Sequence, residues 1–358
     1  MLAPDGPRPA SRGDGRCCVA HAAPRPTGAG QVAGLGAVRG RGRSRAEPDS
    51  VVAVDVGGTG LKGARFSLDG AVLERRTLPT PVAQGPGAVL DAVAALAAGL
   101  TAPTTCAVGI GCPGLLDTGA GVVRYAPNLG LRDAPLVEAV RRRTELPVVL
   151  EHDVRAACLA EGRLGAAPGA RDLLLVVLGT GIAAGLVVGG VPVVGATGAA
   201  GELGHLPVVP GGEPCTCGQR GCLEVYSSAG GLVRRYRAAG GDADVTTAAE
   251  LAARLPGDAL AARLWGEGAR ALATALVTST LLLDPSLVVL AGGLSGAGER
   301  LSRPVEAALA EGLAWRPPPP VVISPLGGRA GLVGAALRAV DLHGGGSGAW
   351  APAVAAAS

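Results

Sequence analysis

The regular hydrophobic pattern of this chain begins at Val51, where short apolar blocks alternate with glycine-containing turns. Three such blocks follow one another as VVAVDVGG, LKGARFSL and AVLERRTL. Each block has the length and the β-branched content of a strand, and the small residues between the blocks suit tight turns. The folded region is therefore predicted to open with a meander of three strands.

The segments after the meander alternate between helical and strand patterns. In the first half, the pattern predicts helices over 87–100, 135–144 and 154–165, with strands over 106–114 and 147–153. In the second half, it predicts strands over 173–181, 183–190, 191–194, 286–293 and 321–326, with several helices among them and a last helix over 331–342. The same order of elements thus occurs twice along the chain.

A three-strand meander followed by alternating helices and strands, present twice, is typical of the actin-like ATPase (ribonuclease H-like) fold. In that fold a nucleotide lies in a cleft between two lobes. We therefore predict an α/β protein with an N-terminal lobe over 51–166 and a C-terminal lobe over 167–342. A chain of 358 residues with 48% hydrophobic residues has enough apolar material for two such cores.

The two ends of the chain lack this pattern. Residues 1–48 are rich in Pro, Gly, Ala and Arg, and they are predicted to form a disordered leader. An alternative is that translation begins near Val51. The Gly- and Ala-rich segment 343–358 is predicted to be a flexible tail.

Residues 173–201 carry no charged side chain and are long enough to span a bilayer. Their Gly and Val content favours successive buried strands over one continuous helix, so we expect no membrane span. The N-terminus lacks a compact apolar block followed by a cleavage site, so we do not expect a secretory signal. A cytoplasmic location is expected instead.

The net charge of +3 is small for a chain in which 17% of the residues are charged. No strong basic field is available to attract nucleic acid or a membrane surface. The expected partners are therefore small molecules.

The turn after the first predicted strand reads DVGGTGLK. Gly57 and Gly58 let backbone N–H groups approach phosphate oxygens, while Thr59 and Lys62, the only lysine of the chain, can address the phosphates directly. Asp55, at the strand end, can hold Mg²⁺ through water. The alternative is an ordinary glycine-rich hairpin with a solvated lysine.

The corresponding turn of the second half contains Gly179, Thr180 and Gly181. A nucleotide between two lobes needs a phosphate grip from each side, so the pair of loops indicates ATP binding more strongly than either loop alone. A third glycine pair, Gly292 and Gly293, follows a predicted strand and is expected under the adenosine. A close helix–strand contact would explain that pair equally well.

Asp153 ends one predicted strand and precedes a predicted helix, facing the crevice where the lobes should meet. An aspartate there can align an acceptor hydroxyl beside the γ-phosphate of ATP and accept its proton. The alternative is a helix N-cap, a role that aspartate fills well.

The segment GELGH followed by CTCGQRGCLE is the most specific stretch of the sequence. His205 with Cys215, Cys217 and Cys222 offers one imidazole and three thiolates, the ligand set of a closed structural zinc site over 205–222. A disulfide between two of these cysteines is the alternative, but it would leave the third cysteine and the histidine unexplained.

Two carboxylates, Glu202 and Glu224, flank this cluster. Carboxylates suit vicinal hydroxyls of a sugar. If one ring nitrogen of His205 binds zinc, the other N–H is oriented and can donate to a sugar oxygen.

Together, DVGGTGLK, GIGCPG, the strand-end Asp153, GTGIAAG and the GELGH…CTCGQRGCLE segment resemble the ROK family of bacterial sugar kinases and sugar-responsive repressors. The resemblance extends from Val51 to Leu342. Repressor members carry a winged-helix domain before the kinase-like part, and residues 1–48 show no helix-turn-helix pattern, so the enzymatic branch is favoured.

The resemblance implies a homodimeric, ATP-dependent hexose kinase with Mg²⁺ and structural Zn²⁺. It implies that Asp153 is the catalytic base and that Glu202, His205 and Glu224, with Asn128 of the PNLG segment, bind the sugar. Glucose is the first expectation for the substrate. N-acetylmannosamine, N-acetylglucosamine and fructose are alternatives, as is a catalytically weak sugar-sensing protein.

Two positions depart from the family pattern. His152 stands immediately before the catalytic aspartate, where the family usually has an asparagine that bonds a sugar hydroxyl, and Arg155 replaces a second asparagine. An imidazole can donate one hydrogen bond as an amide does, so His152 is expected to bind the sugar with an altered preference.

Overall fold

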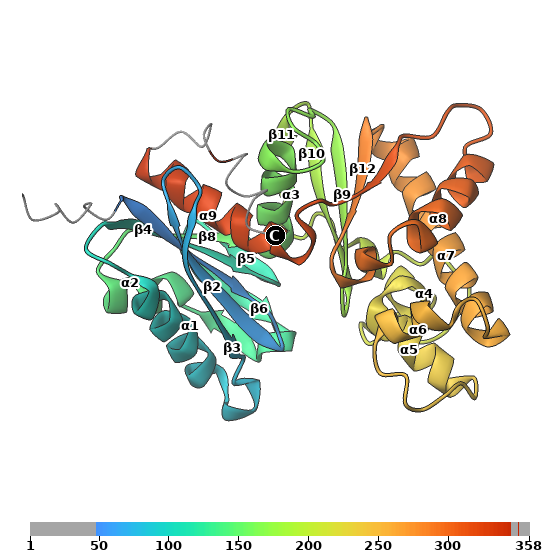
Figure 1. Cartoon of the computed structure of the whole chain (residues 1–358), viewed down its shortest axis with the longest axis horizontal. Helices are drawn as coiled ribbons and strands as arrows, with labels where there is room; N and C mark the ends of the chain where they lie inside the picture. The colour runs from blue at the N-terminus through green and yellow to red at the C-terminus, as the bar shows by residue number, and fades with distance from the viewer. Residues whose placement is uncertain (1–47, 345–349, 351–358) are drawn as a thin grey trace, which may run out of the picture. The chain divides into compact units, whose positions relative to one another are not determined.

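The computed structural model describes residues 48–344 and Trp350 (Figure 1). The predicted leader lies outside the described residues except for Pro48, and most of the predicted tail lies outside them as well. Trp350 is fully buried, stacks on Phe66 with ring centroids 5.4 Å apart, and donates a hydrogen bond from Nε1 to the Leu68 carbonyl at 2.8 Å. This residue of the tail segment is therefore packed against the folded region.

The predicted meander forms the antiparallel strands β1 (Ser50–Val56), β2 (Gly60–Ser67) and β3 (Val72–Pro79). β4 (Thr105–Cys112) pairs parallel with β1, and β8 (Val148–His152) pairs parallel with β4. The first sheet therefore has the order β3-β2-β1-β4-β8. Helices cover both faces of β1 and β4, which explains why these sequences are almost continuous apolar runs.

The second sheet repeats this plan with the order β11-β10-β9-β12-β13. Its strands are β9 (Leu173–Leu178), β10 (Ile182–Val188), β11 (Val191–Pro192), β12 (Leu287–Ala291) and β13 (Val321–Ile323). The first three pair antiparallel, and β12 and β13 add parallel to β9. Two sheets of one topology confirm the predicted actin-like ATPase fold.

The uncharged stretch over 173–201 forms β9, β10 and β11, as its glycine content predicts. Among the described residues, no helix is both long and apolar enough to cross a membrane.

The principal helices of the described chain follow the predicted order. They are α1 (Pro86–Leu100), α2 (Leu136–Thr144), α3 (Asp153–Leu164), α4 (Leu223–Ser227), α5 (Ala229–Ala238), α6 (Ala248–Arg254), α7 (Ala259–Leu283), α8 (Glu299–Gly312) and α9 (Ala330–His343). α1 and α2 pack on the outer face of the first sheet, and the helices from α4 to α8 form a core with the outer face of the second.

Helices α3 and α9 lie between the two sheets, sharing one apolar core with both of them (Figure 1). We expected the last helix to complete the lobe over 167–342, but α9 packs on the first sheet instead. A Cβ added to Gly109 of β4 would lie 1.9 Å from the Ala335 carbonyl oxygen. Because Gly109 has no side chain, the backbone of α9 rests directly on β4.

A small antiparallel sheet, which the sequence pattern did not predict, joins β5 (Leu115–Asp117), β6 (Val122–Ala126) and β7 (Leu131–Ala134). Its strands are too short to show a clear period of two. The sheet matters for function because Asn128 lies in the 3₁₀ turn between β6 and β7.

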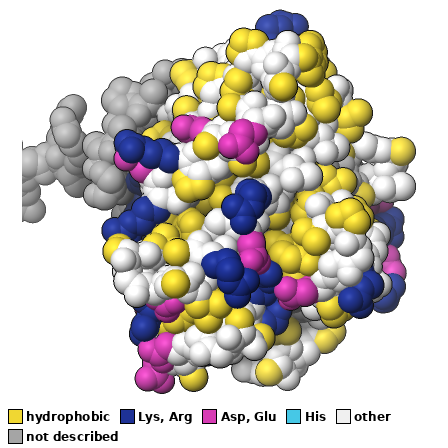
Figure 2. All heavy atoms as spheres, turned by 90° about the vertical axis from the view of Figure 1, so that its right-hand side faces the viewer, with side chains coloured by type: hydrophobic (Ala, Val, Ile, Leu, Met, Phe, Trp, Pro, Cys, Tyr) yellow, Lys and Arg dark blue, Asp and Glu magenta, His cyan; other side chains and the backbone are white. Residues whose placement is uncertain are grey.

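The helices of the second lobe present a face on which basic and acidic side chains are interspersed (Figure 2). In this lobe Arg235 of α5 pairs with Glu213 at 2.6 Å and with Glu267 of α7 at 2.8 Å. The positive charges in this part of the protein are therefore locally balanced.

Candidate active site

Asp55 and Asp153 converge at the carboxyl ends of the parallel strands of the first sheet. Asp55 lies near the end of β1, and Asp153 is the first residue of α3, directly after β8. Gly111 of β4 lies between them, since a Cβ added there would be 3.6 Å from Asp153 Cα and 3.7 Å from Asp55 Oδ1. Strand ends of this kind are where open α/β sheets bind ligands.

A cavity of about 200 Å³, here called the cleft cavity, opens beside these two carboxylates. Asp55, Lys62 and Asp153 line it, together with the predicted pair Gly292 and Gly293 that follows β12. Its remaining lining residues are Val154, Ala157, Val177, Ala291, Gly327, Gly328, Ala330 and Gly331. Both sheets and α9 thus contribute to one space, as a nucleotide cleft requires.

The two carboxyl groups of the cleft cavity hold their protons more tightly than ordinary aspartates. Burial raises the pKa of Asp153 to about 6. Burial first, and then the charge of Asp153, raise the pKa of Asp55 to about 6, while Lys62 opposes the rise. The charges of Lys62 and Arg155 offset only part of these rises, so the two buried carboxyls suit a divalent cation bound with the nucleotide phosphates.

The residue before the catalytic candidate, His152, caps α3 with its side chain. His152 Nδ1 accepts a hydrogen bond from the Val154 N–H at 3.3 Å, so histidine takes the N-cap role that had been the alternative for Asp153. Asp153 Oδ1 accepts from the same N–H at 2.8 Å. Burial, followed by the charge of Arg155, lowers the pKa of His152 to about 4. The ring is therefore neutral near pH 7.

The Arg155 side chain is engaged in an ion-pair network with Glu151 rather than available to a sugar. Its Nε donates to Glu151 Oε1 at 2.9 Å, and its Nη1 donates to the carbonyl of Gly198 at 3.3 Å. Arg338 of α9 lies 3.4 Å from the other oxygen of Glu151. Arg155 thus ties the start of α3 to the loop that leads into Glu202.

The second-lobe turn at 179–181 is held against the cysteine-rich segment. Glu224 Oε2 accepts a hydrogen bond from the Ile182 N–H at 3.0 Å, and a Cβ added to Gly181 would lie 2.5 Å from the same oxygen. The Ala229 N–H donates to the Gly179 carbonyl at 2.9 Å. A side chain at position 181 would push this carboxylate aside, so the glycine allows the close approach of Glu224.

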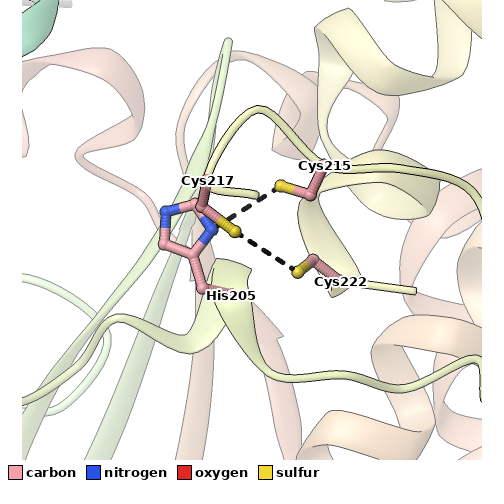
Figure 3. A group of neighbouring side chains, drawn as sticks. All are labelled: His205, Cys215, Cys217 and Cys222. Atoms are coloured by element: carbon pink, nitrogen blue, oxygen red, sulfur yellow. Dashed lines mark hydrogen bonds between the residues drawn. The ribbon is translucent and has the colours of Figure 1, made fainter. Parts of the chain in front are cut away.

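The four predicted metal ligands lie together (Figure 3). Their ligand atoms are all within 4.8 Å of one another. His205 Nδ1 is 3.8 Å from Cys215 Sγ, and Cys217 Sγ is 3.7 Å from Cys222 Sγ. Sulfur atoms joined to one tetrahedral zinc by bonds of about 2.3 Å are about 3.8 Å apart, so the observed separation fits zinc.

The alternative of a disulfide within this cluster is not what the structure shows. Cys215, Cys217 and Cys222 are free thiols, and 3.7 Å between sulfurs is far beyond the roughly 2.05 Å of a disulfide bond. The tight turn 215–219, closed by the Cys215 N–H to the Gln219 carbonyl at 2.8 Å, aims the thiols inward. The second ring nitrogen of His205 points away from the sulfurs in Figure 3.

The residues predicted to bind sugar come from three separate segments. Asn128 lies against the first turn, because a Cβ added to Gly58 would be 3.3 Å from the Asn128 carbonyl oxygen. Glu202 lies close enough to His152 for its charge to oppose the lowering of the histidine pKa. The structure thus brings Glu202 to His152 and Glu224 to the turn at 179–181.

Six predicted phosphate-loop residues are not part of the lining of the cleft cavity. These are Gly57, Gly58, Thr59, Gly179, Thr180 and Gly181. They lie in the turns that follow β1 and β9 in the two sheets. Their roles toward ATP remain a prediction from the paired loops.

Sequence reasoning missed Gly327 and Gly328, which line the cleft cavity from the turn before α9. The doublet GG after the last predicted strand was the available signal. The fully buried Glu161 of α3 accepts a hydrogen bond from the Ser324 hydroxyl, and Ser324 Oγ accepts from the Gly327 N–H at 2.9 Å. Burial raises the pKa of Glu161. Glu161 therefore anchors this turn to the helix that begins with Asp153.

Comparison with known proteins agrees with this geometry. The chain is 35% identical over 306 residues to the glucokinase of Streptomyces coelicolor, a match that covers 80% of this chain and 96% of that protein. It is 34% identical over 264 residues to the N-acetylmannosamine kinase of Shigella flexneri, covering 73% of this chain and 89% of that protein.

Among solved structures, the ROK family glucokinase from Streptomyces griseus in complex with glucose and AMPPNP superposes with a TM-score of 0.73 at 35% identity. That match covers 82% of this chain and 99% of the other. Residues 51–341 match the ROK family. This span contains both sheets and the cysteine-rich segment. A chain with this cleft, this cluster and this match belongs to the ROK family.

Proposed function

We propose that this protein transfers the γ-phosphoryl group of ATP to a hydroxyl of a hexose, with glucose converted to glucose 6-phosphate as the principal reaction. The observation that carries the proposal is the position of Asp153, at the start of α3 and at the wall of a cavity shared by both lobes. The glucokinases of Streptomyces coelicolor and Streptomyces griseus are similar to this chain along nearly their whole lengths.

Asp153 acts as the general base. Its carboxylate accepts the proton of the sugar hydroxyl while the hydroxyl oxygen bonds to the γ-phosphorus and the bond from phosphorus to the β,γ-bridging oxygen breaks, so ADP leaves. The elevated pKa of about 6 makes this carboxylate a better base than an ordinary aspartate while leaving it ionised at pH 7.

ATP is held by residues from both lobes. Lys62 and the turn after β1 address its phosphates from one side, the turn at 179–181 addresses them from the other, and Gly292 and Gly293 lie under the adenosine. Asp55 would hold Mg²⁺, which supplies charge neutralisation for the phosphate oxygens. The charge of Asp153 contributes to the raised pKa of Asp55, and a bound cation would offset this repulsion.

The sugar is held by Glu202, Glu224, His152, His205 and Asn128. His205 gives Nδ1 to the metal cluster with Cys215, Cys217 and Cys222, and its Nε2–H faces the sugar. Zn²⁺ would supply only structural rigidity here, because four protein ligands close a tetrahedral site. A rigid segment fixes the two glutamates without the entropy cost of ordering a free loop.

The decisive experiment mixes the purified protein with Mg²⁺-ATP and a panel of hexoses and follows ADP release. We expect the highest kcat/KM with glucose, and loss of turnover in the Asp153→Asn variant. N-acetylmannosamine is the second candidate substrate, because the chain is 34% identical to an N-acetylmannosamine kinase. Sugar binding without ADP release from any member of the panel would instead indicate a sensor.

The assembly and location of the enzyme are part of the same proposal. We take it to act as a homodimer in the cytoplasm, where a reducing environment keeps the thiols of the cysteine cluster available for metal. Light scattering coupled to size-exclusion chromatography tests the dimer, and a monomer at micromolar concentration would contradict it.

A further inference from the structure

A second cavity, of about 190 Å³, adjoins the cleft cavity and is here called the β3 cavity. It lies between β2, β3 and the start of α9, and it shares only Lys62 and Gly328 with the cleft cavity. Its other lining residues are Gly63, Phe66, Val72, Arg75, Arg76, Thr77, Arg329, Leu332 and Val333. Lys62 therefore forms part of the wall between two separate spaces.

The lining of the β3 cavity is strongly basic. Lys62, Arg75, Arg76 and Arg329 line it, and no carboxylate does among the residues that the structure describes. Arg76 is paired with Glu74, with Nε 2.8 Å and Nη2 2.6 Å from Oε1. The Lys62 Nζ donates to the neutral carbonyl of Gly328 at 3.2 Å, and its charge also acts on Asp55 in the neighbouring cleft cavity. The cavity is thus electrostatically suited to an anion.

The floor of the same cavity is apolar. Phe66, Val72, Leu332 and Val333 contribute it, and the Trp350 ring stacked at 5.4 Å behind Phe66 holds the phenyl ring in place. An inorganic oligophosphate would gain nothing from burying these side chains, because it has no apolar surface to place on them. An organic anion uses both the basic rim and the apolar floor.

We propose that the β3 cavity is a binding site for a small organic anion, one with a single phosphate or carboxylate group and an apolar face about the size of a six-membered ring. The volume is below that of ordinary drug-sized pockets, which restricts the ligand to a small metabolite. The site is separate from the sugar and nucleotide sites, so it stands whichever hexose the enzyme phosphorylates.

Occupancy of this site affects the nucleotide through Lys62. A single ammonium group cannot fully satisfy an anion in the β3 cavity and the ATP phosphates in the cleft cavity at once. Each ligand therefore weakens the other by the same finite factor, as linkage between two sites requires. The ligand of the β3 cavity is thereby a negative effector of ATP binding.

The test uses phenyl phosphate as the probe and measures its Kd by calorimetry, with and without saturating Mg²⁺-AMPPNP. We expect binding that AMPPNP weakens by a factor that levels off, about threefold to tenfold for one shared hydrogen-bonded charge. Inorganic phosphate should bind at least about tenfold more weakly than phenyl phosphate, since it leaves the apolar floor unused.

Two rim variants and a control locate the site. Arg75→Glu and Thr77→Asp, both at exposed positions of β3, should each weaken phenyl phosphate binding about tenfold. Arg303→Glu, a matched charge reversal on an exposed position of α8, should leave it unchanged. Melting temperatures of all three variants verify that they are folded.

Several results would overturn the proposal. If the apparent Kd of phenyl phosphate rises in proportion to the AMPPNP concentration without levelling off, phenyl phosphate binds in the nucleotide site. Equal affinity for inorganic phosphate would remove the role of the apolar floor. Absence of binding, or binding unaffected by Arg75→Glu and Thr77→Asp, would show that the β3 cavity takes no such ligand. None of these readouts depends on kinase activity, so failure here is distinct from failure of the proposed function.

Discussion

His152 Nδ1 lies 3.1 Å from Asp153 Oδ1, so the imidazole that replaces the family's usual asparagine lies directly against the carboxylate that we propose as the general base. The Val154 N–H lies 3.3 Å from the same nitrogen and 2.8 Å from Asp153 Oδ1, so Nδ1 is engaged with the start of α3. Nε2 is then the ring nitrogen of His152 that we expect to bond a sugar hydroxyl.

A substitution at this position therefore tests sugar binding. His152→Ala should raise the KM for the preferred sugar about threefold to tenfold through the lost hydrogen bond, with little change in the KM for ATP. His152→Asn, which restores an amide donor, should keep the sugar KM near that of the native enzyme. Steady-state kinetics with each substrate varied in turn measures both values, and an unchanged sugar KM in His152→Ala would contradict the contact.

Removal of the base should stop the chemical step. Asp153→Asn keeps the shape of the side chain but cannot accept a proton, so kcat should fall by about 10² to 10⁴. Asp91→Asn, the same change at an exposed position of α1, serves as the control and should leave kcat unaltered. Retention of native kcat by Asp153→Asn would transfer the role of base to another group.

The pKa of about 6 at Asp153 predicts the acid limb of the pH profile. A base must be ionised, so kcat/KM should be level above pH 7 and should fall below pH 6. The fall should approach about tenfold per pH unit well below the pKa for the loss of one base, and it should be steeper where Asp55 also gains a proton. Rates measured from pH 5 to pH 8 test this, and a profile that stays flat down to pH 5 would exclude an elevated pKa.

His152 gives the stability of the fold a separate pH dependence. Its pKa in the folded protein is lowered from 6.5 to about 4, so its contribution to the free energy of unfolding is present above pH 6.5 and is lost as the pH falls toward 4. His152→Asn removes this titration. Between pH 7 and pH 5, the native protein should therefore lose more stability in urea unfolding than the His152→Asn variant.

The metal cluster should be needed for sugar binding more than for nucleotide binding. Metal analysis should find about one zinc per chain, as expected for one four-ligand site. Cys217→Ser should lower the zinc content, reduce the melting temperature and raise the sugar KM more than the ATP KM. Cys106→Ser changes a thiol outside the cluster and is the matched control. If zinc-free protein binds sugar as tightly as the native protein, zinc has no structural role in sugar binding.

Arg155 should contribute to the stability of the fold through its ion pair with Glu151, and not to sugar binding. Arg155→Met leaves the partly buried Glu151 with Arg338 at 3.4 Å and the His152 N–H at 2.9 Å as its partners, and should cost about 2 to 3 kcal/mol of unfolding free energy. The double variant Glu151→Gln/Arg155→Met removes the unpaired carboxylate and should recover part of that loss. Urea unfolding of the two single variants and the double variant measures the coupling, and strictly additive losses would contradict it.

The strands and the clustering of the candidate metal ligands were predictable because their signals are local. The meander at Val51, the Asp55 turn, and the ligand set from His205 to Cys222 each occupy a short stretch with a distinctive composition. The structure confirms the two sheets and brings the four predicted metal ligands together. Local periodicity is enough to predict a strand or a ligand cluster when residues close in sequence determine it.

The parts that were not predictable depend on contacts between distant segments. The placement of α9 against β4 rests on Gly109 and Ala335, which are far apart in sequence. Arg155 could be identified as a departure from the family pattern, but its bond to the Gly198 carbonyl follows only from the folded loop. The β3 cavity likewise joins Arg75 to Arg329 across most of the chain.

Two glycines at the contacts of α9 with its neighbours limit how the lobes can move. A Cβ added to Gly334 would lie 1.8 Å from the Ala156 carbonyl oxygen of α3, and the one at Gly109 would lie 1.9 Å from that of Ala335. Backbones in direct contact have no flexible layer between them that could absorb sliding. Opening and closing of the cleft should therefore rotate the lobes about these two contacts. Asp153 lies close to them and should move little, whereas the proposed sugar ligands Glu202 and Glu224 should move further.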